Sequence, residues 1–325
     1  LGEVIDGICA YIDNPKIKLF QMMKYIQAPD FPTGGYIIAG ELLQAYETGR
    51  GKITLRAKVS IEEGDNDKKL IVITELPYQV NKAKLLTKIA SLRDEKKEIL
   101  GGISEITDES DRNGMRAIKV KKDADAEKIL AALYKYSDLE TTFGINMVAI
   151  ADGKPQQLGL LDIIKHYVAY QREVVLRRTK FDLNQAKERC HILEGLIIAV
   201  RNIDEVIEII KTSESVPVAR QRLRDRFSLS ERQAQAILDL RLARLTKLEI
   251  YKLEQELEEL KKLIARLTAI VESKKLQMDV VKEEMLALKK QYKSERKSAL
   301  VFDAKEIKVE KFDDVKPAVP CALVY

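Results

Sequence analysis

The sequence has few of the features that stabilise secreted or membrane proteins. Its 325 residues include only three cysteines, Cys9, Cys190 and Cys321. They are far apart and form no CxxC or cysteine–histidine spacing, which excludes a disulfide framework and a zinc site and favours a cytoplasmic location. No stretch approaches the roughly 18 unbroken apolar residues of a membrane helix, so no membrane partner is expected. The chain starts at Leu1 without a methionine or a secretory signal, and we expect an internal part of a longer protein.

The motifs of common catalytic chemistry are also missing. No Walker loop or GxGxxG string follows an expected strand, so ATP hydrolysis is not expected. The two histidines, His166 and His191, have no partners arranged for nucleophilic or acid–base work and are expected to pack between helices. The acidic run Asp108, Glu109 and Asp111 leads into an Asn-Gly pair, which favours a loop over a metal site. We therefore predict no catalytic residue and no metal ligand.

Charge and hydrophobicity describe a folded protein. The chain is 46% hydrophobic, enough to fill cores, and 33% charged with a formal net charge of only +5. Charges of opposite sign must therefore alternate along solvated faces rather than gather in blocks. This balance excludes a disordered tail, and its modest basic excess is compatible with nucleic acid as a partner.

Glycine and proline divide the chain into two halves. Both are frequent up to about Gly159, whereas neither occurs over residues 160–194 or 218–316. The pattern predicts a compact α+β domain followed by long helices. In the first half, periodicity and capping residues predict helices near 5–12, 17–26, 41–46, 81–97 and 126–136, and strands near 52–61, 70–73 and 116–121. Gly49 is expected to end the third helix in a left-handed conformation.

Basic residues alternate along the first predicted strand. Arg50 and Lys52 enter it, and Arg56 and Lys58 continue on the same face of the predicted hairpin. Such a face can neutralise backbone phosphates and bind nucleic acid without reading its sequence. The alternative is an ordinary solvated strand face, which the pattern alone favours.

The second half contains two long amphipathic helices. On the first, apolar residues recur at Ile163, Tyr167, Tyr170, Val174 and Phe181. The second carries an alternating four- and three-residue spacing typical of a coiled-coil seam, at Leu253, Leu257, Leu260, Ile264, Leu267 and Val271. Two such helices with an irregular helical stretch between them predict an antiparallel pair that carries a small tip.

Eight strings occur in an order that identifies a family. They are Phe31–Gly35 (FPTGG), Tyr46–Lys52 (YETGRGK), Thr74–Lys82 (TELPYQVNK), Asp108–Arg116 (DESDRNGMR), Thr142–Met147 (TFGINM), Arg177–Thr179 (RRT), His191–Gly195 (HILEG) and Gln233–Leu242 (QAQAILDLRL). Together they resemble the A subunits of the bacterial type IIA DNA topoisomerases, DNA gyrase and topoisomerase IV. Eight collinear strings over most of the chain are hard to attribute to chance.

The resemblance implies an architecture. Residues 1–155 correspond to the α+β tower domain, 156–188 to the ascending coiled-coil helix, and 189–248 to the helical exit gate through which two subunits dimerise. Residues 249–297 correspond to the descending helix, and 298–325 to a linker toward a C-terminal domain. Ile37 and Ile38 invite comparison with the isoleucine that this family wedges between base steps. That residue precedes the tower, however, so both are expected to be buried in packing.

The resemblance also implies a function. The family binds double-stranded DNA and changes its topology by strand passage, which favours phosphate contacts by Arg50, Lys52, Arg56, Lys58 and Lys82. Its nucleophile is a tyrosine that follows an arginine, and none of the 12 tyrosines here does so. The fragment is therefore expected to be inactive alone.

Partners and location follow from the same resemblance. The expected partners are a second copy of the chain and a B subunit that holds magnesium and ATP in an A2B2 enzyme. The expected location is bacterial and associated with the nucleoid. The alternatives are a non-catalytic architectural DNA-binding coiled-coil protein and a family paralogue that has lost cleavage. The sequence does not distinguish gyrase from topoisomerase IV.

Overall fold

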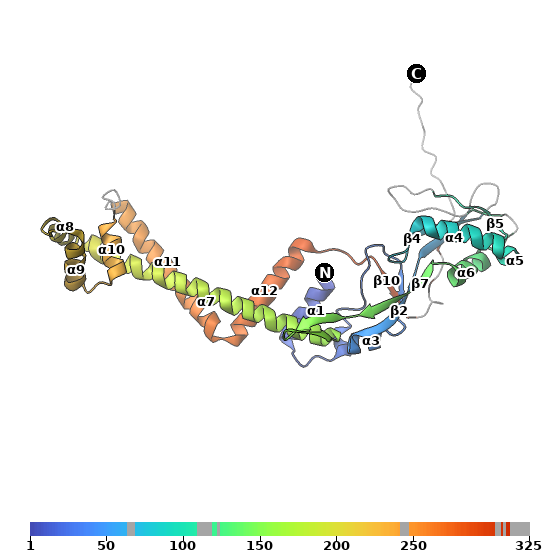
Figure 1. The fold of residues 1–325 in the computed structure, drawn as a ribbon, viewed down its shortest axis with the longest axis horizontal. Helices are drawn as coiled ribbons and strands as arrows, with labels where there is room; N and C mark the ends of the chain where they lie inside the picture. The colour runs from blue at the N-terminus through green and yellow to red at the C-terminus, as the bar shows by residue number, and fades with distance from the viewer. Residues whose placement is uncertain are drawn as a thin grey trace, which may run out of the picture. The chain divides into compact units, whose positions relative to one another are not determined.

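The structure, a computed structural model, describes residues 1–63, 69–108, 119–121, 124–240, 247–302, 307 and 310–312. The chain divides into two compact units. Unit 1 comprises Leu1–His166 and Leu286–Tyr325, and unit 2 comprises Tyr167–Met285. All described β-strands belong to unit 1, and the described elements of unit 2 are helices (Figure 1). This confirms the predicted combination of a sheet-containing region and a helical region.

Unit 1 contains short helices and three sheets. Its helices are α1 (Gly2–Asp13), α2 (Leu19–Met22), α3 (Leu42–Thr48), α4 (Lys82–Glu95), α5 (Lys97–Leu100) and α6 (Ala126–Tyr136). Its strands are β1 (Tyr36–Ile38), β2 (Arg50–Arg56), β3 (Lys58–Glu63), β4 (Lys69–Glu75), β5 (Ile103–Glu105), β6 (Lys119–Val120), β7 (Glu140–Asn146), β8 (Val148–Ala151), β9 (Lys154–Gln157), β10 (Ala299–Val301) and β11 (Glu310–Phe312).

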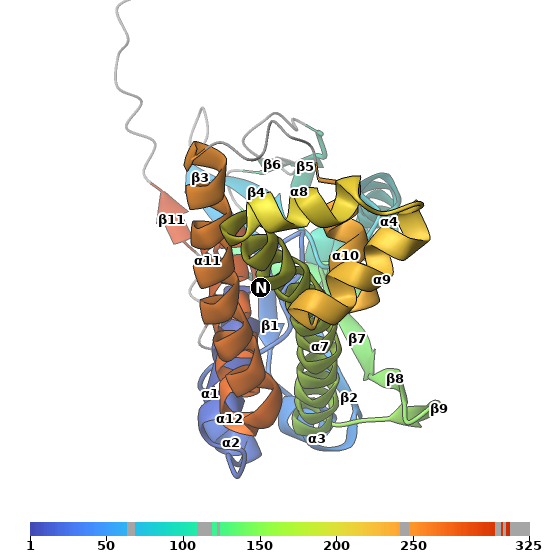
Figure 2. The same ribbon diagram turned by 90° about the vertical axis from the view of Figure 1, so that its left-hand side faces the viewer.

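The strands form a four-stranded sheet in the order β10-β1-β2-β7, a five-stranded sheet in the order β11-β3-β4-β6-β5, and the hairpin β8–β9. The hairpin projects beyond the end of β7 (Figure 2). The strand predicted near 52–61 is in fact two strands, one in each larger sheet, and they part at Ala57. This alanine is fully buried. Its N–H donates to the Leu139 carbonyl oxygen at 2.8 Å, which extends the pairing with β7 by one residue, and its own carbonyl oxygen accepts the Tyr134 hydroxyl at 3.2 Å.

A hydrophobic core of unit 1 lies between the five-stranded sheet and helices α4 and α6. Ile71 and Ile73 of β4 meet Leu85 and Ile89 of α4 there, and all four are fully buried. The predicted N-cap of α4 is confirmed, because the Asn81 side chain accepts the Lys84 N–H at 3.1 Å. The helix predicted near 126–136 is α6. Of the strand predicted near 116–121, residues 119–120 form β6, and residues 116–118 lie outside the described residues.

The segment after α12 (Lys274–Tyr292) joins the beginning of the chain. Strand β10 pairs in parallel with β1, which the sequence pattern did not indicate. Just before it, the Arg296 guanidinium donates to both carboxylate oxygens of Glu3, at 2.7 and 2.6 Å, and to the carbonyl oxygens of Ala28 and Pro29 at 2.6 and 2.9 Å. Bonding to Glu3 raises the pKa of Arg296. The two distant segments are thus tied by charge-assisted hydrogen bonds.

Asp30 belongs to the same junction. Burial by itself raises the pKa of this carboxyl, but N–H donors of Ser298 and Lys297 outweigh it, and the pKa falls below its usual 3.8. Because the native state then binds fewer protons than the unfolded state, this contribution to stability is present above about pH 3.8 and is lost as pH falls through the lower native pKa.

Asp30→Ala is therefore expected to lower the free energy of unfolding at neutral pH. The difference from the unsubstituted chain is expected to shrink steadily below about pH 3.8. Urea unfolding of both proteins across this range measures the difference. A gap that stays the same, or that widens with acid, would contradict the assigned role of the carboxylate.

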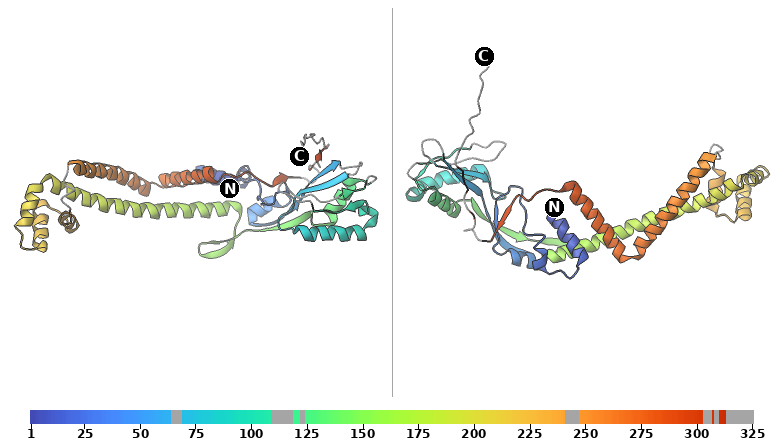
Figure 3. Two further views of the ribbon diagram at one scale, coloured as in Figure 1. Left: turned by 90° about the horizontal axis from the view of Figure 1, so that it is seen from above. Right: turned by 180° about the vertical axis from the view of Figure 1, so that it is seen from behind.

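Unit 2 is built on helices that run in opposite directions. Helix α7 (Leu160–Arg201) enters it from unit 1 and is followed by α8 (Ile203–Lys211), α9 (Val216–Phe227), α10 (Glu231–Leu238), α11 (Lys247–Glu272) and α12. Three ion pairs join α7 to the returning helices, between Arg201 and Glu254, Glu194 and Lys261, and Arg178 and Glu284. Residues later in α7 pair with residues earlier in the returning helices, so α7 and the returning helices are antiparallel (Figure 3). No described helix has the length and apolarity to cross a membrane.

The apolar residues predicted on α7 are not its buried stripe. Tyr170 and Phe181 are 57% and 61% exposed, whereas Val168, Val175 and Leu183 are buried. Other buried positions of α7 are Ile164, Thr179, Ala186, Cys190, Leu193, Leu196, Ile197, Ala199 and Val200. The sequence pattern did not indicate this stripe, because residues such as Thr179 and Ala186 are too small or too polar to be predicted as core residues.

The returning arm also differs from prediction. The single helix expected over 249–297 is two helices, which separate at Ser273 and end at Tyr292. The Gln277 side chain, itself buried, donates to the Ile270 and Val271 carbonyl oxygens at 3.0 and 3.1 Å, and so satisfies the end of α11.

The predicted tip is a small helical core around the end of α7 (Figure 2). Leu193 and Ala199 of α7, Leu223 of α9 and Ala234 of α10 are fully buried within it. The chain breaks predicted near 202–204 and 213–217 correspond to Asn202, between α7 and α8, and to residues 212–215, between α8 and α9. Ser230 caps α10 as predicted and accepts the Gln233 N–H at 3.2 Å.

Candidate nucleic-acid interface

A tight connection between α3 and β2 positions the first two predicted DNA-binding residues. Gly49 ends α3 with a φ of 80°, which confirms the expected left-handed cap. A Cβ at Gly49 would lie 2.5 Å from the Leu158 carbonyl oxygen, so no larger residue fits. Gly51 passes against α3, where a Cβ would lie 2.8 Å from that of Ala45. Because side chains alternate along a strand, Arg50 and Lys52 point away from α3.

The outward face of β2 and β7 is polar. Three residue pairs lie opposite each other across the strands: Arg50 and Asn146, Lys52 and Gly144, and Thr54 and Thr142. All are exposed except Thr54, which is partly exposed. We call these six residues the β2–β7 face. A shallow cavity of about 810 Å³ lies over one end of it and is bordered also by Gln157 of β9.

Gly144 has no side chain, so the backbone is exposed at the centre of this face. A Cβ added there meets nothing within 4 Å. Gly144 lies on β7, at the edge of its sheet and directly opposite Lys52. A phosphate group can therefore approach the strand closely while it remains beside the lysine.

Glu41 partly offsets the positive charge of Arg50 and Lys52. Its carboxylate accepts the Lys52 backbone N–H at 3.1 Å. Among the described residues that border the cavity, Arg50 and Lys52 are the cations and Glu41 is the acid. The cavity lining thus carries an excess of one positive charge among otherwise neutral residues, several of which can form hydrogen bonds. That character suits contact with a phosphate backbone better than recognition of one small ligand.

Arg56, at the far end of β2, is engaged within the chain. Its Nε lies 2.6 Å from Glu140 Oε2, and its guanidinium lies 4.5 Å from the centroid of the Tyr134 ring. Burial raises the pKa of the Tyr134 hydroxyl, and Arg56 opposes that rise. With a side chain only 16% exposed, Arg56 stabilises the junction between the two sheets, and its contact with DNA stays a prediction.

The remaining two predicted residues lie elsewhere. Lys58 begins β3 in the five-stranded sheet, and Lys82 begins α4 with its Nζ 2.7 Å from Asp108 Oδ2. The structure therefore brings together Arg50 and Lys52 but not the full set of five. Glu109 and Asp111 lie outside the described residues, and no cluster of possible metal ligands occurs in the part of the chain that is described.

Sequence reasoning missed the β7 half of the face. Thr142, Gly144 and Asn146 belong to a recognised string but received no role. Their signal was present, because polar or small residues alternate there with Phe143 and Ile145. On β1, which pairs with the other edge of β2, Ile37 is fully buried as expected, whereas Ile38 is only partly buried and lies opposite Thr54.

Comparison with known proteins decides the family. The family model for the A subunit of DNA gyrase/topoisomerase IV matches residues 1–286. The chain belongs to this family.

Curated relatives agree with this family. The DNA gyrase A subunit of Clostridium acetobutylicum is 50% identical over 312 residues, which cover 95% of this chain and 37% of the relative. The DNA gyrase A subunit of Halalkalibacterium halodurans is 51% identical over 302 residues, with 92% and 36% covered. The DNA topoisomerase 4 A subunit of Staphylococcus epidermidis is 45% identical over 313 residues, with 96% and 39% covered. The chain thus spans little more than a third of the length of these relatives.

Three strings that carry the family resemblance meet in unit 1. The rings of Phe31, Tyr78 and Phe143 lie with centroids 5.0 to 6.2 Å apart. Beside them the Glu75 carboxylate accepts the Gly35 N–H at 2.5 Å. A side chain at Gly34 would collide with that carboxylate. These strings therefore form one packing site that joins the start of β1, the end of β4 and β7.

Two more of the family strings meet in unit 2. His191 Nε2 lies 2.7 Å from Ser230 Oγ, and the Gln233 amide donates to the His191 carbonyl oxygen at 2.7 Å. Gly195 allows this approach, because a Cβ there would lie 2.7 Å from Gln233 Cβ. His191 is exposed, and its side chain connects α7 to the start of α10 through the hydrogen bond with Ser230.

Proposed function

We propose that this gyrase/topoisomerase IV family member supplies the DNA-supporting and exit-gate part of a bacterial type IIA DNA topoisomerase. In this proposal, unit 1 corresponds to the tower domain and supports a duplex. The antiparallel helices of unit 2 correspond to the coiled-coil arm, and the α8–α10 tip is the gate through which two copies dimerise. The longer enzyme passes a second duplex through a double-strand break.

The β2–β7 face is the observation that supports DNA binding. Its two exposed cations, hydroxyl and amide side chains and bare backbone suit phosphate groups, which are the same in every sequence. Binding is therefore expected to be independent of sequence and strongly weakened by salt.

Cleavage requires residues beyond this chain. Among its 12 tyrosines none follows an arginine, which is the arrangement of the family's nucleophile. Magnesium and ATP are assigned to the partner B subunit of an A2B2 enzyme, which acts in the bacterial cytoplasm at the nucleoid. The isolated chain is expected to be a dimer that binds duplex DNA but neither cleaves nor supercoils it.

Alanine at both Arg50 and Lys52 tests the proposed interface. Each cation that contacts a phosphate contributes roughly 0.9 to the slope of log affinity against log salt concentration. The double variant is therefore expected to lose about two units of slope. Fluorescence anisotropy with a short mixed-sequence duplex, measured over a salt series, gives the slope.

A matched variant with alanine at Lys180, an exposed residue of α7, and at Lys88, an exposed residue of α4, removes the same charge elsewhere. It is expected to keep a slope close to that of the unsubstituted chain. If both double variants lost the same amount of slope, binding would reflect general electrostatic attraction, and this would contradict the assignment of the interface.

A further inference from the structure

A second, chemically different cavity opens in unit 1. It has a volume of about 520 Å³, within the usual range for pockets that hold small organic molecules. Helix α2, helix α3 and the end of β10 contribute its walls. Its lining residues are distinct from those of the cavity over the β2–β7 face.

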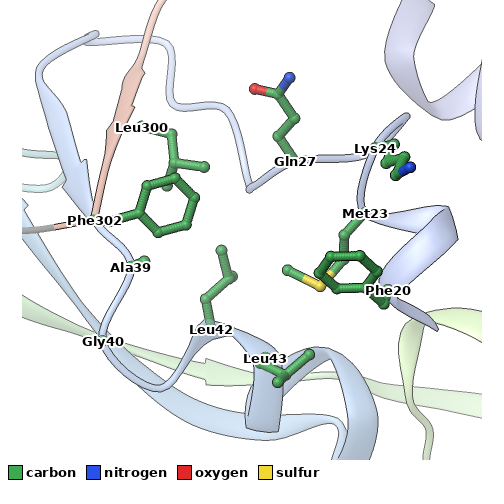
Figure 4. A pocket seen from close by; sticks show the side chains of 10 residues that line it. All are labelled: Phe20, Met23, Lys24, Gln27, Ala39, Gly40, Leu42, Leu43, Leu300 and Phe302. Carbon is green, nitrogen blue, oxygen red and sulfur yellow. The ribbon is translucent and has the colours of Figure 1, made fainter.

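The walls are apolar and uncovered. Phe20 and Phe302 are 74% and 76% exposed, and Figure 4 shows their rings on opposite sides of the cavity. Leu43 is 54% exposed at one side, whereas Leu42 beside it is only 2% exposed and forms a fixed support. Two exposed phenyl rings on opposite sides of an apolar hollow leave room for a hydrophobic body between them.

The charge of the lining indicates which polar group a ligand of this cavity would carry. Lys24 is the one charged residue among those described around the cavity, and no carboxylate borders it. Gln27 lies with Lys24 on the side away from Leu43 (Figure 4). An ammonium beside an amide at the rim of an apolar site favours a ligand with one anionic group.

We propose that this cavity is a binding site for a small organic anion with a flat apolar body. The body lies between Phe20 and Phe302, and the anionic group faces Lys24. This site is separate from DNA binding, so its occupancy does not depend on the proposed topoisomerase role.

Anilinonaphthalene sulfonate is a suitable probe because it combines two aromatic parts with one sulfonate. We expect saturable binding of one dye per chain, at least fivefold weaker in Phe20→Ala and Phe302→Ala and at least tenfold weaker in Leu43→Glu. Ile150→Ala, which truncates an 80% exposed side chain of β8, is the control and is expected to bind normally. Lys24→Gln is expected to weaken the sulfonate dye several-fold but not its neutral analogue N-phenylnaphthylamine.

A second measurement is independent of substitution. In methyl-labelled protein, dye is expected to shift the signal of Met23, which lines the cavity, and to leave that of Met278 in unit 2 unchanged. Saturating duplex DNA is expected not to displace the dye. Unsaturable binding, equal affinity for both dyes, or unchanged affinity in both phenylalanine variants would overturn the proposal. So would a Leu43→Glu variant that dissociates an assembly in sedimentation, because the face would then bind protein.

Discussion

Gly144→Glu is expected to lower the affinity of the chain for duplex DNA at least tenfold at moderate salt. The substitution places a carboxylate opposite Lys52, at the centre of the β2–β7 face. The new charge pairs with the lysine, removes one phosphate contact and repels the remaining phosphates. Because open space surrounds this position, the fold has no steric reason to change.

Gly144→Gln is the matched control, since it has the same shape without the charge. Its effect is expected to be several-fold smaller, and the difference between the two variants is expected to fade as salt rises. Anisotropy titrations of both variants at several salt concentrations measure this difference. If glutamate and glutamine weaken binding equally, the loss is steric; if neither weakens it, DNA lies elsewhere.

Arg296→Ala is expected to destabilise unit 1 by about 3 kcal/mol. The guanidinium is only 19% exposed and donates to Glu3 and to the Ala28 and Pro29 carbonyl oxygens. Its removal leaves a carboxylate and two carbonyl groups without their donor, which costs more than the loss of an exposed ion pair. The pairing of β10 with β1 begins three residues later and is expected to loosen with it.

Hydrogen exchange measures the loosening locally. Amides of α1 and β1 that exchange through opening of this junction are expected to exchange roughly a hundredfold faster in the variant. Lys293→Ala removes the same charge from an exposed position nearby and is expected to leave exchange unchanged. Protection that survives in Arg296→Ala would show that the strand pairing alone holds the two ends together.

The candidate site was predictable in part. The string Tyr46–Lys52 contains Gly49 and Gly51, which shape the backbone of the site, and also both of its cations. The cations could be placed on one face because alternation along a strand is visible in the sequence. Arg56 looked equivalent to Lys52, and only the fold shows that Glu140 and Tyr134, more than seventy residues away, engage it. Gly144 stands in an alternating stretch of the sequence, but only the fold shows that it lies opposite Lys52.

The sequence by itself determined the family, the succession of a mixed α/β half and a helical half, and the caps of α3, α4 and α10. These follow from local chemistry: glycine at a left-handed position, side chains that accept N–H groups, and strings of residues in a fixed order. Only the tertiary structure decided that the basic strand is split between two sheets at Ala57, that β10 returns to β1, and which stripe of α7 is buried. Those features depend on partners distant in the chain, and a periodic pattern cannot specify which partner a face will meet.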